Sequence, residues 1–326
     1  MRLRALFASA VAAVSIICAA GNAAAQAFPA RPVRIVPFGT AGGPVDVMAR
    51  LYAEKLRARW NQPVIVEAKP GASGTLAADL VARAPADGTT FLITLSLTHI
   101  NNVVLQKNIP YDPFRDFEPL SLLALGYGPA LMAPAGAPFN DMRELLAYAK
   151  RKPGGLAYGT WGTGSTPHLF SEMLAKQAGV QLVHVPYKGE AAAHLDLFAG
   201  ALDLAWANTG TARTHLKSGK VKVLGATGSK RSDVLPDTPL FGEQGFAGFE
   251  LTTWIAAYAP GKTAPAIVDP LSAALREATL QPEIAGRWRD IGFEPVATTP
   301  EELARIHRAD FPRWKRMIEA AGVTPE

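Results

Sequence analysis

Short β-rich segments alternate with helical segments along most of this chain, and this alternation limits the possible folds more than any other feature. Residues 33–36 predict a strand, and residues 45–60 predict a helix because their apolar side chains recur every three or four positions. Such alternation is typical of an α/β fold with parallel-rich sheets flanked by helices. Further strands are predicted at 64–66, 91–94, 156–158, 182–185, 202–206 and 221–224, and further helices at 76–84, 141–150, from 166 onward, 267–279, 282–291 and 300–321.

The length of the chain favours two lobes rather than one. Beyond a leader of 25 residues, about 300 residues remain, which is long for a single core. The elements from 139 to about 241 form a self-sufficient set, and strands near 120–132 and 251–258 flank that set as crossings between lobes, so the second lobe is expected at 128–244. We therefore expect a first lobe from 26–127 that is completed by 245–326, with the second lobe inserted between them.

The first 25 residues have the order of a secretory signal peptide. Arg2 and Arg4 precede an uncharged apolar run at 5–20, and small residues follow before Gln26. A membrane-spanning helix needs about 20 apolar residues, and this run is shorter. We expect cleavage after Ala25 or two residues later, and a mature protein in the periplasm.

Composition excludes several classes of protein. With 48% hydrophobic and 19% charged residues, the chain is expected to be globular. Its net charge of +5 comes from scattered basic residues, so we expect no nucleic-acid partner. The six histidines lack metal-ligand spacing, and the single cysteine, Cys18, lies in the leader, so we expect no metal site.

Enzyme signatures are incomplete in this sequence. Gly261–Lys262–Thr263 resembles the end of a phosphate-binding loop, but Ala256 stands where the earlier glycine is required. The Gly-x-Ser-x-Gly pattern of a nucleophile elbow does not occur. We expect no catalytic residues and no cofactor.

A first glycine-rich segment, 37–46, joins the first predicted strand to the first long helix. Glycines allow the backbone to approach a ligand closely, and a helix N-terminus favours an anion. An ordinary strand-to-helix turn is an equally good interpretation of this segment alone. The site residues expected here are Phe38, Gly39, Thr40, Gly42 and Gly43, together with Asp46 as a helix cap rather than an anion contact.

A second segment, 159–168, repeats the same layout of strand, glycine-rich loop with hydroxyls, and helix start. Two such loops facing each other would hold a carboxylate from both sides, so the repetition favours a functional role. Pro167 follows a predicted cap at Thr166. The site residues expected from this segment are Trp161, Gly164, Ser165 and Thr166.

Candidate residues also follow three more predicted strands, because open parallel sheets bind their ligands at the carboxyl ends of strands. Ser96, His99 and Asn101 follow one strand, and Asn208 follows another. Tyr187 follows a third and is either a cleft residue or a packing residue; its neighbour Lys188 is either a cleft residue or a solvated charge.

A set of short motifs, in a fixed order over the whole mature chain, resembles the Bug-type receptors, which are the TctC-like substrate-binding proteins of tripartite tricarboxylate transporters. The motifs are RIVPF at 34–38 with Gly42, Gly43 and Asp46, EAKPGASG at 67–74, DG at 87–88, PYDP at 110–113 with DF at 116–117, HVPYKG at 184–189, LPDTP at 235–239, GFE at 248–250 with Trp254, and APG at 259–261.

This resemblance implies a two-lobed periplasmic binding protein fold, type II-like, that closes on a small organic acid for uptake. It also implies permease subunits of a tripartite transporter as partners, and a carboxylate held by backbone N–H groups, hydroxyls and water. A sensing receptor and a two-domain α/β enzyme remain the alternative interpretations, and we expect a monomer.

The sequence departs from the family's pattern in three places. The first loop is one residue longer before Gly42, Trp161 stands where small residues are usual, and Asn208 stands where Asp is common. These differences concern the ligand rather than the fold. Because Trp161 and Phe38 could flank a flat ligand, we expect a carboxylate with a bulky apolar or aromatic body, unless Trp161 packs against its own lobe.

Overall fold

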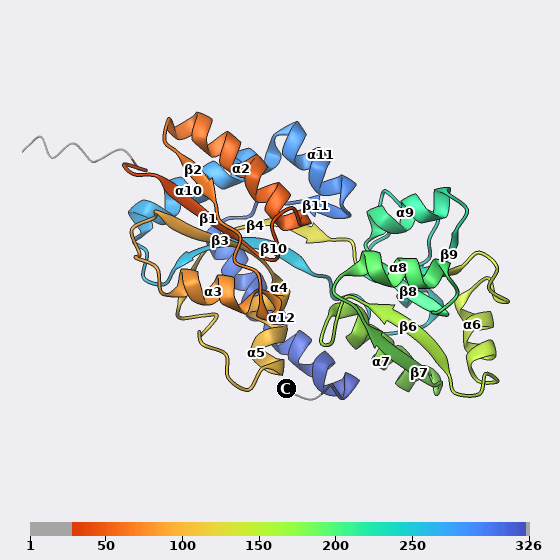
Figure 1. Cartoon of the computed structure of the whole chain (residues 1–326). Helices are drawn as coiled ribbons and strands as arrows, with labels where there is room; N and C mark the ends of the chain where they lie inside the picture. Colours follow the sequence, from red (N-terminus) through yellow and green to blue (C-terminus); the bar gives the residue numbers. More distant parts are fainter. Residues whose placement is uncertain (1–27, 324–326) are drawn as a thin grey trace, which may run out of the picture.

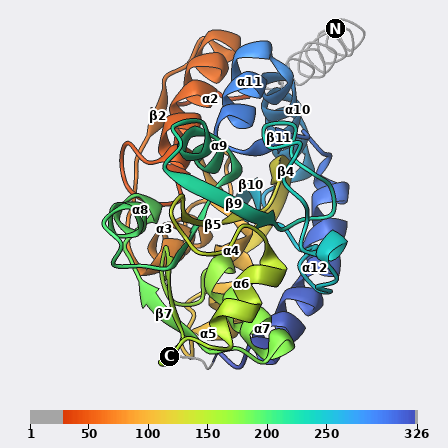
Figure 2. The ribbon, with the colours of Figure 1, turned by 90° about the vertical axis from the view of Figure 1, so that its right-hand side faces the viewer.

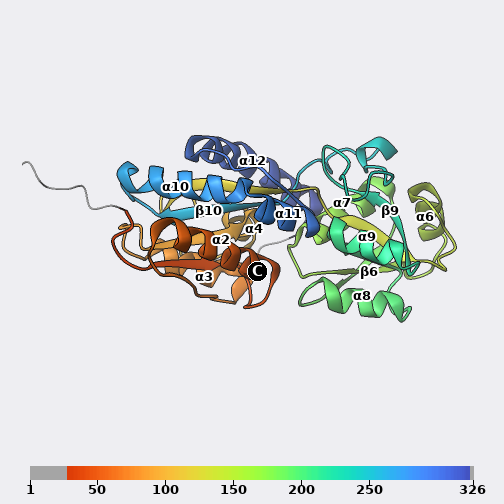
Figure 3. The ribbon, with the colours of Figure 1, turned by 90° about the horizontal axis from the view of Figure 1, so that it is seen from above.

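The computed structural model describes residues 28–323, which form two mixed sheets flanked by helices and lying side by side (Figures 1 and 3). The predicted signal peptide lies outside the described residues. Among the helices of residues 28–323, none is long and apolar enough to cross a membrane. The α/β prediction is confirmed.

The first sheet has the strand order β11-β4-β10-β3-β1-β2. Strands β1, β2 and β3 are parallel, whereas β10 runs antiparallel to β3 and β4, and β11 runs antiparallel to β4. Its strands are β1 (Val33–Pro37), β2 (Val64–Val66), β3 (Thr90–Leu95), β4 (Phe117–Gly126), β10 (Trp254–Pro260) and β11 (Phe293–Pro295).

Alternating side chains bury both faces of this sheet. Ile35, Phe91 and Ile93 pack in one core cluster, and Val36 and Leu92 pack in another on the opposite face. The helices of the first cluster are α2 (Pro44–Trp60), α10 (Pro265–Leu280) and α11 (Pro282–Asp290), and those of the second include α3 (Thr75–Ala82) and α12 (Pro300–Ala321).

The second sheet has the strand order β7-β6-β8-β5-β9 and is also mixed. Strand β6 is parallel to β7 and β8, whereas β5 is antiparallel to β8 and β9. Its strands are β5 (Ala130–Pro134), β6 (Leu156–Thr160), β7 (Leu182–Pro186), β8 (Leu204–Ala207) and β9 (Val221–Ala226), and its helices are α6 (Met142–Ala149), α7 (Thr166–Ala178), α8 (Glu190–Phe198) and α9 (Thr209–Lys217) (Figure 2).

Local structure refines the sheet prediction and corrects two predicted caps. Strand β1 is parallel to β2 and β3, and β6 is parallel to β7 and β8, whereas the strands that lead between the sheets, β4, β5 and β10, are antiparallel to their neighbours. The expected caps are each displaced: Gly43, not Asp46, is the N-cap of α2, and Ser165, not Thr166, is the N-cap of α7. Asp141, at the start of the helix predicted at 141–150, is the N-cap of α6 and accepts a hydrogen bond from the Glu144 N–H at 2.8 Å.

Two segments cross between the sheets, at 127–129 and 227–253, and they touch where they leave the second sheet. The N–H of Thr227 donates to the Pro129 carbonyl at 3.0 Å. Gly128 and Gly228 both have positive φ, and a Cβ on either would lie within 2.5 Å of a backbone oxygen of the other segment. Only glycine allows this approach, so the paired crossing is built into the sequence.

Helix α12 is a third link between the sheets. It packs against β4 of the first sheet and against α7 beside the second sheet. Trp314 of α12 lies 6.5 Å from Phe170 of α7, measured between ring centroids. Lys176 of α7 also donates to the Ala320 carbonyl at 2.6 Å. The two halves therefore share one continuous core cluster.

Candidate functional site

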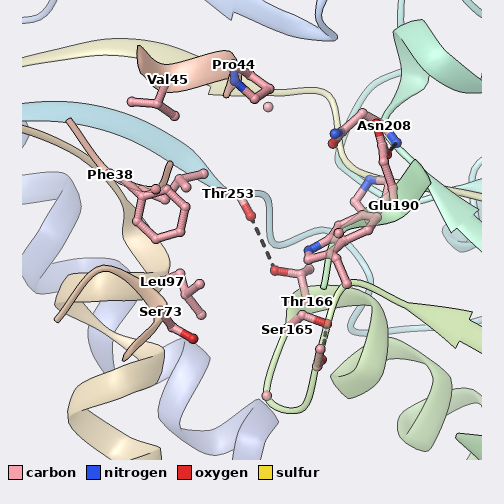
Figure 4. Close-up of a pocket in the computed structure, with 18 of the residues that line it drawn as sticks. Phe38, Pro44, Val45, Ser73, Leu97, Ser165, Thr166, Glu190, Asn208 and Thr253 are labelled. Carbon is pink, nitrogen blue, oxygen red and sulfur yellow. Dashed lines mark hydrogen bonds between the residues drawn. The ribbon is translucent and has the colours of Figure 1, made fainter. Parts of the chain in front are cut away.

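A cavity of about 640 Å³ lies between the two sheets and is lined by residues from both (Figure 4). Phe38, Leu97 and Ser73 line one side, and Glu190, Asn208, Thr166 and Ser165 line the other. Much of the wall is apolar, and ligand pockets of this size and character are typical of small-molecule sites. Its large apolar side chains are Phe38, Leu95, Leu97, Leu105, Trp161, Ile255, Ile291 and Phe293.

The first loop, between β1 and α2, is held from inside the protein. Asp46 is fully buried; its carboxylate accepts the Gly42 N–H at 2.9 Å and pairs with Arg50. Burial would raise the pKa of Asp46, but the hydrogen bonds from Arg50 and Gly42 outweigh it and hold the pKa below its usual value. The loop and the first turn of α2 thus present their backbone to the cavity, while Asp46 faces inward.

The second loop, between β6 and α7, is held by a dense set of hydrogen bonds. The Ser165 hydroxyl donates to the Gly162 carbonyl at 2.6 Å, and the Gly164 N–H donates to His168 Nδ1 at 3.0 Å. Asn101, which belongs to the other half of the molecule, donates to the Gly164 carbonyl at 3.3 Å. The loop therefore lies where the two halves meet.

Two charged residues, Lys188 and Glu190, line the cavity among the residues that the structure describes. The Glu190 carboxylate accepts the Asn208 N–H at 2.9 Å and the Thr211 hydroxyl at 2.8 Å. It therefore braces the start of α9 instead of offering a free charge. Lys188 is exposed and carries the positive charge of the wall.

Nine of the residues expected at the site line the cavity together: Phe38, Gly39, Thr40, Gly43, Trp161, Gly164, Ser165, Thr166 and Asn208. The other six do not line the cavity: Gly42, Asp46, Ser96, His99, Asn101 and Tyr187. Both loops predicted from their glycines thus reach the same cavity.

Three of the six residues that do not line the cavity have identifiable structural contacts. His99 is fully buried and stacks on Tyr258, with 4.4 Å between the ring centroids. Ser96 accepts the Trp254 N–H at 3.4 Å. Tyr187 donates to the Asp196 carboxylate at 2.5 Å, whereas its neighbour Lys188 lines the cavity.

Other lining residues escaped the sequence reasoning because they come from segments without a recognisable motif. They include Glu190, Ile291, Phe293 and Val323. The Gly189–Glu190 pair at the start of α8 was an available signal, since it repeats the pattern of glycine before a helix. Within residues 28–323, no group of three His, Cys, Asp or Glu side chains is placed to hold a metal ion.

Two mixed α/β halves joined by paired crossing segments, with a large cavity between them, define a binding protein of the periplasmic type. The model of the tripartite tricarboxylate transporter family receptors, TctC, matches residues 48–323. The chain belongs to this family of solute-binding receptors.

Individual relatives cover nearly the whole chain. The UPF0065 protein in the tcbD-tcbE intergenic region of Pseudomonas sp. strain P51 is 35% identical over 90% of this chain and 87% of its own length. The periplasmic binding protein BugD is 34% identical, with a TM-score of 0.79, covering 92% of this chain and 100% of its own. Rpa4515 of R. palustris, solved with adipate, is 32% identical, with a TM-score of 0.82 over the same shares.

Proposed function

We propose that this protein binds an organic carboxylate in the cavity between its two sheets. One observation carries the proposal: two glycine-rich loops, each leading into a helix N-terminus, line the same cavity from opposite halves. Helix N-termini and loop N–H groups favour an anion. The adipate bound to Rpa4515 supports a carboxylate ligand in a relative of similar fold.

The ligand's body is proposed to be bulky and apolar or aromatic. Phe38 and Trp161 line the cavity from different halves, and Leu95, Ile255 and Phe293 add apolar wall. Asn208 supports an acid, because its amide carries no charge that would repel a carboxylate and can donate a hydrogen bond.

We propose that the lobes, 26–127 with 245–326 and 128–244, close around the ligand by bending at the paired crossing segments. Gly128 and Gly228, each of which lies against the backbone of the other crossing segment, support a hinge there. Closure would be favoured by contacts that the ligand makes only in the closed state. Identical scattering curves with and without saturating ligand would argue against closure.

The wider role is proposed from family membership: an exported monomer that delivers its ligand to the permease subunits of a tripartite transporter. A sensing role through a signalling partner is the second candidate, since the same closed state could serve either. The family consists of substrate-binding proteins, and we propose no catalytic step for this chain.

Thermal unfolding of the mature protein with a panel of acids tests the proposal. Benzoate, phthalate, adipate and malate are compared with glucose and putrescine as uncharged and cationic controls. A ligand at 100 times its Kd should stabilise the native state by about 2.7 kcal/mol. We expect at least one acid, and neither control, to stabilise. Stabilisation by a control instead of the acids would refute the carboxylate assignment.

A further inference from the structure

Behind the second loop, two histidines hold the backbone that lines the cavity. His168, in the first turn of α7, is 8% exposed, and its Nδ1 accepts the Gly164 N–H at 3.0 Å. An imidazole nitrogen accepts a hydrogen bond only when it carries no proton. The observed contact therefore requires the neutral ring with its proton on Nε2.

The second histidine supports the first and holds the other end of the loop. The His184 ring stacks on His168, with 3.9 Å between centroids and an interplanar angle of 12°. Its Nε2 lies 2.7 Å from the Thr160 hydroxyl, which also accepts the Gly162 N–H at 3.2 Å. Two rings this close disfavour a charge on both, so the pair acts as one unit.

The groups around the pair set its charge. On α7, Glu172 Oε1 lies 4.0 Å from His168 Nε2; from β6, Tyr158 donates to Glu172 and stacks on His184. Burial lowers the pKa of His168, and Glu172 offsets this only in part. Burial, together with His168, lowers the pKa of His184 to about 4.

Among residues 28–323, no other charged group contributes to the pKa shifts of the two rings. From α5 (Asn101–Leu105), the uncharged Asn101 and Leu105 meet the loop. Helix α12 contacts α7 through Trp314, which packs near Phe170, and through the Ala320 carbonyl, which accepts from Lys176. At pH 7 both rings are therefore neutral.

Gly164 is held from both halves of the molecule through the two peptide groups on either side of its Cα. Its N–H is bound by His168 from its own half, and its carbonyl accepts from Asn101 of the other half. If His168 gains a proton, Nδ1–H faces the Gly164 N–H, and two donors oppose each other. The Thr163–Gly164 peptide must then turn, which disturbs the cavity wall and strains the adjoining Gly164–Ser165 peptide, whose carbonyl contacts the other half.

We propose that His168, supported by His184, is a positioning residue whose neutral imidazole holds the Gly164 peptide for ligand binding, so that affinity falls when the pair is protonated. The inference rests on the proposed carboxylate site. Loss of one buried hydrogen bond corresponds to a roughly 5- to 150-fold rise in Kd.

Calorimetric titration between pH 4.5 and 8 tests this with the tightest acid of the panel. His168→Asn keeps an acceptor near the Nδ1 position but cannot be protonated, and His168→Leu has no acceptor. His307→Asn is the control, because His307 is also buried with a pKa of about 4 but contacts the His99 carbonyl and not a cavity loop.

We expect the ratio of wild-type to His168→Asn Kd to be near one at pH 8 and to rise as the pH falls; this ratio cancels the ligand's own titration. His168→Leu should bind weakly at every pH, and His307→Asn should keep the wild-type pH slope. A ratio that is constant with pH, or wild-type affinity in His168→Leu, would overturn the inference.

A measurement without ligand separates this inference from the proposed function. The Gly164 amide signal in ¹H–¹⁵N spectra should shift as the pH falls in the wild type and stay fixed in His168→Asn. Equal movement in both proteins would overturn the hydrogen-bond argument even if an acid binds. If no acid binds at pH 8 but the signal behaves as expected, the carboxylate proposal fails and the positioning role of His168 stands.

Discussion

Gly164 offers the sharpest test of how the two halves meet. Its φ is +73°, and a Cβ at this position would lie 2.6 Å from Leu105 Cδ1 of the other half. Gly179, at the end of α7, has a similar φ of +62° and no atom within 4 Å of its would-be Cβ. Gly164→Ala and Gly179→Ala therefore share backbone strain, but only the first adds a clash across the cleft.

The two costs act on different equilibria. Alanine in the left-handed region costs about 1–2 kcal/mol, which lowers the free energy of unfolding in both variants. The clash meets only the terminal methyl of Leu105, whose partly buried side chain can shift, so the overpacking cost stays at the low end, about 1 kcal/mol. Because opening the lobes relieves that clash, it acts on ligand binding, and we expect a roughly 5-fold higher Kd for Gly164→Ala than for Gly179→Ala.

Urea unfolding without ligand measures the strain, and calorimetric titration with the tightest acid measures the closure cost. Leu105→Ala and the double variant Gly164→Ala/Leu105→Ala complete a cycle that isolates the clash. Because the clash is absent from the double variant, its Kd should be close to that of Leu105→Ala alone. Equal affinity losses in Gly164→Ala and Gly179→Ala, or no recovery in the double variant, would refute the reasoning.

Further predictions address the ligand, the stability and the leader. Trp161→Ala should weaken binding of an aromatic acid by about 0.5–1.5 kcal/mol in titrations and leave an aliphatic diacid unchanged; equal losses would contradict the aromatic proposal. Burial lowers the pKa of His307 to about 4 from 6.5, so the unfolded chain takes up the proton first. The stability from neutral His307 is complete above pH 6.5, and about 2–3 kcal/mol of it is lost by pH 4; urea unfolding should show a smaller acid loss in His307→Asn. Asp46→Ala removes the buried carboxylate that accepts from the Gly42 N–H and pairs with Arg50, and should cost about 1–3 kcal/mol in urea unfolding, with a smaller loss for Asp46→Asn. N-terminal sequencing of exported protein should find Gln26 or Phe28 first, and a retained start would contradict the leader.

The sequence by itself determined the elements and the two loops. The helix of α2 and the strands β1 and β3 follow from the periodicity of apolar side chains, which is a local property. The glycine-rich loops at 37–46 and 159–168 were also visible, because a sharp turn between strand and helix needs glycine at fixed local positions. These features depend on neighbours a few residues away.

Tertiary structure decided which of those features meet. Asn101 and Gly164 are 63 residues apart in the chain, and no periodicity brings them to one hydrogen bond. The same holds for the antiparallel pairing of β10 with β3 and of β5 with β8. Both pairings follow from how the chain crosses between the sheets. No sequence motif predicted a role for His168, which depends on the contact between its Nδ1 and a loop N–H. Such contacts depend on how two sheets and their helices pack, and packing is fixed by the whole chain at once.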